Sequence, residues 1–462
     1  MSESPASTAR WRAINRRGAV SLSVAGYKAI RNEVTLDIAP LTLISGANSS
    51  GKSSFMQPFL MLKQTVEAQF DPGALLIHGP NVQLTSWLQG LSRGKSRSDT
   101  AESLEVKIQI GAASVKNTYS YSQNQGLTLN ESEYVNKDEA IRVGKSSTSD
   151  TLIRRFNPEF IEYQKSRRKL WDSEASDDTF KLIPYREHCF LDVELDNRRT
   201  TRGVGLISQS GFGSSDYARF LRDIIHVPGL RGNPERTYTS SAAGVRYPGT
   251  MELYVASVIH KWGSEDAHGK AKLTALGEDL RHLGLTWKVK AQRIDDVRLE
   301  LLVARMPSPQ SSGANDLVNI ADVGFGVSQT LPILVALHAA RMNQIVYIEQ
   351  PETHLHPKAQ TRLGEVIVAA SMRGVRVIVE THSSLLLRSI QTSIARGLIS
   401  PDRVSLNWFS RDSQTGFTQV EKAELDKLGR FGGWPVDFDE VADEADWEFL
   451  NAVQEASENE AE

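Results

Sequence analysis

One short loop constrains this chain more than any other feature. Residues 46–53 read GANSSGKS and fit the pattern G-x-x-x-x-G-K-[ST] in full. A strand-like segment precedes the loop, and apolar residues at helical spacing follow it, which is the context this motif requires. The backbone N–H groups of such a loop and the start of the helix bind phosphate groups. The loop therefore predicts a nucleotide site, but by itself it distinguishes neither ATP from GTP nor binding from hydrolysis.

The residues of the loop have separate expected roles. Lys52 reaches the outer phosphates as a point charge, and the Ser53 hydroxyl binds Mg²⁺. The loop accordingly predicts a bound nucleotide and Mg²⁺. The residues expected to contact the nucleotide from this loop are Asn48, Ser49, Ser50, Gly51, Lys52, Ser53 and Ser54.

Two apolar segments further along the chain end in polar residues. QIVYIEQPETHLHP (344–357) places Glu349 at the end of a buried strand, and VRVIVETHSS (375–384) does the same for His382. A parallel sheet collects its ligands at the carboxyl ends of its strands. We therefore predict that Glu349 binds Mg²⁺ or its waters, and that His382 contacts the terminal phosphate or orients water.

His354 and His356 have the spacing of a metal-binding pair. No matching cluster of metal ligands occurs elsewhere in the sequence, so a loop that shapes the site or contacts a partner is the better interpretation.

A second anion-binding feature is predicted at residues 322–329, DVGFGVSQ. Small residues there precede a helix whose first N–H groups, with the Ser328 hydroxyl, form an anion receptor. One chain does not need two such receptors for a single phosphate tail. The simplest interpretation is that Gly326 and Ser328 serve the nucleotide of a second copy.

The alternation of strands and helices after residue 316 favours an α/β fold with a parallel sheet covered on both faces. Residues 71–225 mix polar runs with short strand-like segments and indicate an inserted region. We divide the chain into a flexible leader, a lobe with the phosphate loop, a mixed insertion, a helix–strand subdomain, a second ATPase lobe and an extension with an acidic tail, at 1–20, 21–70, 71–225, 226–315, 316–400 and 401–462.

The composition restricts the partners and the cellular compartment that we expect for this chain. The formal net charge of −3 gives no general attraction to nucleic acid or membrane. The single cysteine, Cys189, excludes a disulfide framework and suits a reducing cytoplasm. No apolar run approaches the roughly 18 residues of a membrane span. Basic clusters at 165–169 and 198–202 leave a DNA contact open, although charge runs are usually solvated faces.

The order of these motifs resembles the ABC-type ATPases that lack membrane domains. The similarity is to the prokaryotic SMC-like and OLD-like AAA branch, which is associated with genome maintenance and anti-phage defence. It is carried by the segments GFGVSQTLPIL, IEQPETHLHP, ETHS, HVPGLRGNPERTY and GRFGGWPVDF. The resemblance implies an ABC-type ATPase head with a mixed sheet core, a helical signature subdomain and an α+β insertion, and it makes ATP the expected nucleotide.

The resemblance also implies roles for single residues. Gly326 and Ser328 match the signature that caps the γ-phosphate of the opposite subunit, and His382 matches the switch histidine. Gln64 is the candidate for a glutamine contact to the metal ion.

One position departs from the family pattern, which has a catalytic glutamate where this chain has Gln350. A glutamine has no basic site for a general base, although it can orient water. Either Glu352 takes the role of base or turnover is slow.

The leading hypothesis is an ATP-gated dimerising ATPase that acts as a sensor or scaffold in anti-phage defence. It would form an ATP-sandwich dimer or a higher homo-oligomer. Its role would resemble that of the ATPase subunit of the PARIS system, with a separate nuclease or toxin as effector.

Two alternatives are weaker. An OLD-like nuclease needs metal ligands at strand ends, whereas the late acids lie in a polar, helix-like tail. These acids are Asp437, Asp439, Glu440, Asp443 and Glu444. An SMC-like DNA maintenance ATPase needs long heptad arms, and no sustained heptad run occurs between residues 66 and 320.

Overall fold

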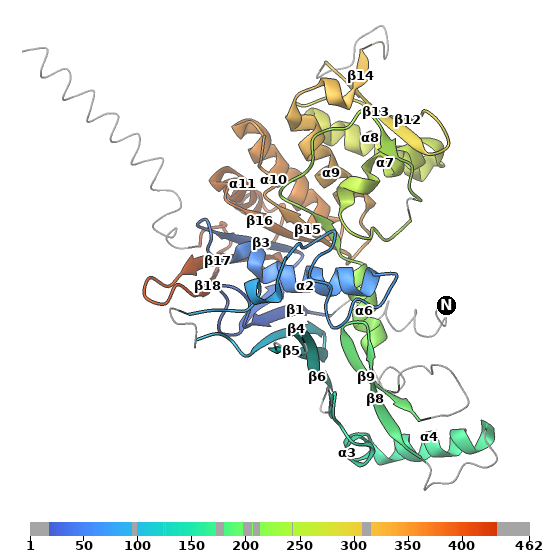
Figure 1. The fold of residues 1–462 in the computed structure, drawn as a ribbon. Coiled ribbons are helices and arrows are strands. Elements are labelled where there is room, and N and C mark those ends of the chain that lie inside the picture. Colours follow the sequence, from blue (N-terminus) through green and yellow to red (C-terminus); the bar gives the residue numbers. More distant parts are fainter. Residues whose placement is uncertain are drawn as a thin grey trace, which may run out of the picture.

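The computed structural model shows a central sheet flanked by helices, an antiparallel sheet with a long extension, and a helix-rich part on the opposite side (Figure 1). In the described part of the chain, no helix has the length and apolar character needed to cross a membrane. The residues that the structure describes are 18–94, 99–122, 124, 126–137, 139–171, 180–196, 206, 213–242, 244–306 and 316–431.

The central sheet is mostly parallel. Its order is β10-β15-β16-β3-β17-β18, with only β18 antiparallel to its neighbour. The register pairs Glu349 with Glu380 and Thr381 with Ser45, so three strands end together beside the phosphate loop. The strands are β10 (Ile225–Val227), β15 (Ile345–Glu349), β16 (Arg376–Thr381), β3 (Leu41–Gly46), β17 (Val404–Arg411) and β18 (Thr418–Ala423).

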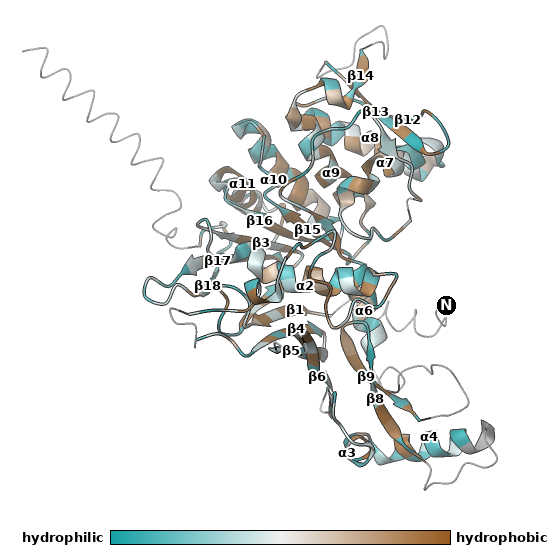
Figure 2. Cartoon of the chain, viewed as in Figure 1, coloured by the Kyte–Doolittle hydropathy of each residue, from teal (hydrophilic) through white to brown (hydrophobic). Residues whose placement is uncertain are grey.

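Alternate residues of these strands enter two different cores. Tyr347 and Ile378 pack with the helix that follows the phosphate loop, whereas Val346 and Val377 pack with three helices on the other face. Because both faces are covered, the strands are apolar almost throughout, and β15 and β16 are brown in Figure 2. The helices are α2 (Lys52–Glu67) on one face and α9 (Phe325–Ala339), α10 (Pro357–Met372) and α11 (Ser384–Ala395) on the other.

The antiparallel sheet unites segments that the sequence separates. Strand β1 pairs with both β2 and β4, so strands of the predicted insertion continue a sheet begun before the phosphate loop. Helix α2 lies between this sheet and the central one (Figure 1). The strands in order are β2 (Val34–Ile38), β1 (Val20–Ala25), β4 (Ser103–Ile110), β5 (Ala113–Ser122), β6 (Gly126–Asn136) and β7 (Glu139–Gly144).

An extension projects from this sheet, and α4 lies at its far end (Figure 1). This helix is distant from the central sheet and is mostly teal in Figure 2. The basic cluster at 165–169 lies on α4, whereas the cluster at 198–202 is outside the described residues. The extension comprises α3 (Ser149–Arg155), α4 (Pro158–Trp171), β8 (Leu182–Glu187), β9 (Phe190–Leu195) and α6 (Ser214–Arg222).

The helix-rich part packs against α9. It combines a small antiparallel sheet with two helices. Its elements are β11 (Tyr238–Thr239), β12 (Val289–Arg293), β13 (Arg298–Ala304), β14 (Leu317–Asn319), α7 (Val255–Ser264) and α8 (Ala267–His282). The α/β fold class predicted from the sequence is thereby confirmed.

Phe409 tests how the sheet supports the phosphate-loop helix. Its ring is 1% exposed and meets Phe55 of α2 edge-on, with centroids 6.1 Å apart. We expect Phe409→Ala to lower the free energy of unfolding by about 3–5 kcal/mol because it leaves a cavity. Phe70 is the control because it is 66% exposed. Phe70→Ala should change the free energy of unfolding by less than about 0.5 kcal/mol. Equal effects in denaturant unfolding would contradict this account of the packing.

Candidate nucleotide-binding site

The phosphate loop bends tightly where it passes β17 and β18. Gly46 has φ 143°, and a Cβ there would lie 2.0 Å from the Phe409 carbonyl oxygen. Gly51 has φ 104°, and its Cβ would lie 2.3 Å from Thr418 Oγ1. Both positions therefore require glycine, since any side chain would be strained and would collide with the neighbouring strands.

Lys52 lies in the centre of the loop and is 4% exposed. Its ammonium group donates to the carbonyl oxygens of Gly46 at 3.0 Å and Ala47 at 2.6 Å. Burial lowers the pKa of Lys52 to about 8, although Glu380 and Glu352 oppose this shift. The loop thus holds a partly desolvated cation at the position where a phosphate tail would bind.

Ser53 contacts a carboxylate that the site prediction did not include. Its Oγ donates to Glu380 Oε1 at 2.6 Å, and Tyr347 donates to Glu380 Oε2 at 2.8 Å. Burial raises the pKa of Glu380. The reason for this pairing is strand order: β16 is hydrogen-bonded to β3, whereas β15 is one strand further away.

Glu349 is held from the β10 side of β15. Its carboxylate lies 3.1 Å from His226 Nε2 and accepts the Gly229 N–H at 3.1 Å. Burial alone would raise the pKa of Glu349, but these hydrogen bonds outweigh burial and hold it below its usual value. Its role as a magnesium ligand stays a prediction.

Three further predicted residues gather around the strand ends. Gln350 lines the pocket beside the loop and has φ 42°, a strained value for a non-glycine residue. Glu352 accepts the His382 N–H at 2.7 Å through Oε1, while its buried Oε2 has no hydrogen-bond partner among the residues that the structure describes. Burial raises the pKa of Glu352, and burial together with Lys52 lowers that of His382. At neutral pH His382 is therefore uncharged.

A pocket of about 310 Å³ lies over the loop. It contains two cations that sequence reasoning missed, Lys28 in the turn after β1 and Arg411 at the end of β17. Arg411 could have been found, because it ends a strand parallel to β3 at the same edge; Lys28 carries no comparable signal. The lining residues are Lys28, Ala29, Asn48, Ser49, Gly51, Lys52, Ser53, Ser54, Gln350, Glu380, His382 and Arg411.

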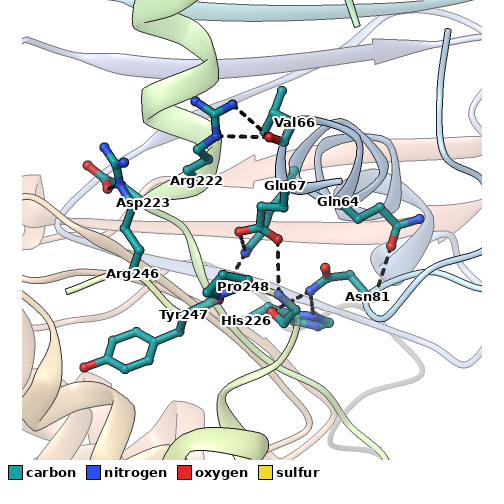
Figure 3. A network of polar contacts seen from close by, with 12 residues as sticks. Gln64, Val66, Glu67, Asn81, Arg222, Asp223, His226, Arg246, Tyr247 and Pro248 are labelled. Atoms are coloured by element: carbon teal, nitrogen blue, oxygen red, sulfur yellow. Dashed lines mark hydrogen bonds and ion pairs between the residues drawn. The ribbon is translucent and has the colours of Figure 1, made fainter. Parts of the chain in front are cut away.

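The prediction for Gln64 is corrected. Its side-chain amide donates to the Leu76 and Val82 carbonyl oxygens and accepts the N–H groups of Asn81 and Val82. Figure 3 shows it turned toward Asn81. Every position of the amide is in use at the C-terminal end of α2, so nothing remains for a metal ion.

Gly326 and Ser328 lie apart from the pocket over the loop. Ser328 is partly buried, its hydroxyl donates to the Phe325 carbonyl oxygen at 3.1 Å, and it lines a different cavity. The two predicted histidines belong to the neighbouring loop. His354 packs beside Phe325, with centroids 5.7 Å apart, and His356 caps α10 by accepting the Lys358 N–H.

The donors beside Lys52 suit a hard cation. The Ser53 hydroxyl and the Glu380 carboxylate are already in contact, and oxygen ligands of this kind are what Mg²⁺ prefers. Within the described ranges, no group of three or more histidine, cysteine or acidic residues could hold a metal unaided. That agrees with an ion held mainly by phosphate oxygens and water.

A phosphate loop at the end of a parallel strand, with a cationic pocket over it, defines a P-loop nucleotide-binding protein. A family profile described as "AAA domain, putative AbiEii toxin, Type IV TA system" matches residues 41–388. The chain belongs to this family. No curated protein sequence matches it.

Solved SMC head domains are similar in structure. One, bound to the C-winged helix domain of ScpA, has a TM-score of 0.44 at 12% identity and covers 89% of this chain and 99% of its own. The Pyrococcus furiosus head bound to the ScpA C-terminal domain gives 0.43 at 11%, covering 89% and 98%. The Thermotoga maritima head gives 0.36 at 10%, covering 88% and 100%.

The lowered pKa of Lys52 predicts how ATP binding depends on pH. The ammonium is charged below about pH 8 and neutral above it. Because a polyanion favours the charged form, affinity should fall as the pH rises past 8, and binding there should take up a proton. Calorimetry above pH 8 in buffers of different ionisation enthalpy measures this uptake. Binding above pH 8 without proton uptake would contradict the assignment of this pH dependence to Lys52.

Proposed function

We propose that this protein is an ATP-hydrolysing ATPase that closes into a homodimer around ATP. One observation carries the proposal: the start of α9 is an open anion receptor that takes no part in the phosphate pocket of its own chain. The residue before the helix is Gly324, which has no side chain to cap the first N–H groups of α9. Ser328 is partly buried, and Phe325 is 50% exposed.

A second copy gives this receptor a ligand. The phosphate loop of one chain would hold the triphosphate, and Gly326 and Ser328 of the other would cap its γ-phosphate through the positive end of the helix. ATP would then bind the closed dimer more tightly than the open protein, which is the condition for a ligand-driven switch.

Hydrolysis in this pocket depends on groups with different tasks. Lys52, with Lys28 and Arg411 nearby, would neutralise the phosphates, and bound Mg²⁺ would add further positive charge. The Gln350 amide can orient the attacking water but cannot accept its proton. Glu352, with an unpartnered Oε2 and a raised pKa, is the candidate base.

The biological setting follows from the same switch. A slow, ATP-gated dimer suits a sensor or scaffold that controls a separate effector, such as a nuclease or toxin. The family description names a toxin of a toxin–antitoxin system, which is compatible with anti-phage defence. A nuclease or toxin gene next to this one would support the proposal, and restoration of defence by this gene alone would contradict the need for an effector.

Ser328→Arg tests the dimer directly. A bulky cation at the start of α9 should block ATP-driven association and leave nucleotide binding within about threefold, since Ser328 lies outside its own pocket. Light scattering with and without ATP measures the association. Ser264→Arg is the matched control, because Ser264 is also a helical serine whose hydroxyl donates to the carbonyl oxygen three residues earlier. Lys52→Ala should abolish binding. Full association of Ser328→Arg would refute the shared site.

Glu352→Gln tests the base. If Glu352 accepts the proton of the attacking water, kcat should fall by about 10²–10⁴-fold while ATP binding is retained. Glu365→Gln, an exposed change on α10, should leave kcat as it is. Unchanged steady-state hydrolysis in Glu352→Gln would remove this residue from the chemistry.

A further inference from the structure

The segment of residues 226–232, HVPGLRG, crosses the carboxyl end of β15. It begins in β10, whose Val227 pairs with Ile348, so the chain leaves the sheet beside Glu349 and Gln350. His226 and Gly229 of this segment hold the Glu349 carboxylate, as described above. The contacts of the segment reach both halves of the proposed ATP site.

Arg231 joins the segment to the strand end. It is 7% exposed, and its guanidinium donates to the carbonyl oxygens of Glu349 at 3.3 Å and Gln350 at 3.0 Å. An arginine presents its N–H groups in a rigid planar fork that can bridge two neighbouring acceptors in this way, whereas a lysine has a flexible stem and no such fork.

Gln329 joins the same segment to α9. It is 4% exposed, and its Nε2 donates to the carbonyl oxygens of Arg231 and Gly232, both at 3.1 Å. Gln329 follows Ser328 directly. The main chain at Gln350 is therefore linked to the first turn of α9 through Arg231 and Gln329.

His226 holds the side chain of Glu349 from the other end of the segment. Asn81 Nδ2 donates to the Gly249 carbonyl oxygen at 2.9 Å and lies 3.0 Å from His226 Nδ1. Since the carbonyl fixes the amide orientation, Nδ1 must be the acceptor. The hydrogen of neutral His226 is then on Nε2, which donates to Glu349. Figure 3 shows Asn81 beside His226.

We propose that residues 226–232 couple the phosphate pocket to the start of α9 within one chain, with Arg231 as the positioning residue. The inference rests on the proposed ATP site. A nucleotide that moves Gln350 would move the Arg231 guanidinium, and the Arg231 and Gly232 carbonyls would carry that shift to Gln329. The receptor for the second copy would thus be placed only when the chain's own pocket is filled.

Hydrogen exchange separates this coupling from dimer formation. The Ser328→Arg protein, kept monomeric by that change, is given Mg²⁺ and a non-hydrolysable ATP analogue. Exchange should slow both in the phosphate loop and at residues 320–335, the latter by at least about fivefold. Adding Arg231→Lys should remove the protection at 320–335 and leave that of the loop. Adding Gln329→Met should have the same effect, because it breaks the link from the α9 side.

Arg376→Lys is the matched control. Arg376 also bridges two carbonyl oxygens, of Ile38 at 3.0 Å and Gly18 at 2.8 Å, but at the opposite edge of the sheet. A general loss of stability should therefore appear equally in this variant, whereas loss of coupling should not. Nucleotide protection of the loop alone, before Arg231 is changed, would overturn the coupling. Protection of neither region would overturn the ATP site and the coupling with it.

Discussion

The parallel register of three strands is the constraint on which the rest of this structure depends. Because Ser45 pairs with Thr381, and Glu380 with Glu349, the phosphate loop and two carboxylates arrive at one edge of the sheet. A shift in pairing would separate Ser53 from Glu380. The register is set in turn by apolar side chains that fill a core on each face, so the geometry of the site is a consequence of core packing.

Glu349 and Glu380 are neighbouring carboxylates at this edge and repel one another, but they have different hydrogen-bond partners. Glu380 receives the Ser53 and Tyr347 hydroxyls, and burial with the nearby Glu349 charge raises its pKa. Glu349 receives His226 and the Gly229 N–H, which hold its pKa down. The surroundings thereby shift the pKa values of these two carboxyl groups in opposite directions. An arriving cation would change that balance at Glu380, next to the phosphate loop, more than at Glu349.

The sequence was sufficient for the local features and insufficient for those that depend on strand order. The phosphate loop, the buried strands and the start of α9 follow from patterns within short windows. The Ser53–Glu380 contact does not, because only the sheet order shows that β16 separates β15 from β3. The metal contact expected of Gln64 was wrong for a related reason. Its helix faces residues 76–82, and the backbone of that segment forms hydrogen bonds with the Gln64 amide. The sequence indicated no role for Arg231, which lies in one of the segments that carry the family resemblance.

Gln350 occupies the position at which the family pattern has a catalytic glutamate, and its backbone contacts suggest why a glutamine can stand there. Its φ of 42° is costly and persists only if the surroundings determine it from several sides. The Gln350 N–H donates to the Glu380 carbonyl oxygen at 2.7 Å, and its own carbonyl accepts from Arg231 at 3.0 Å. A shift of Gln350 would therefore reach both Glu380 and Arg231. Under the proposed function, slow chemistry at this position would suit a switch, since a switch needs a long-lived ATP-bound state more than rapid turnover.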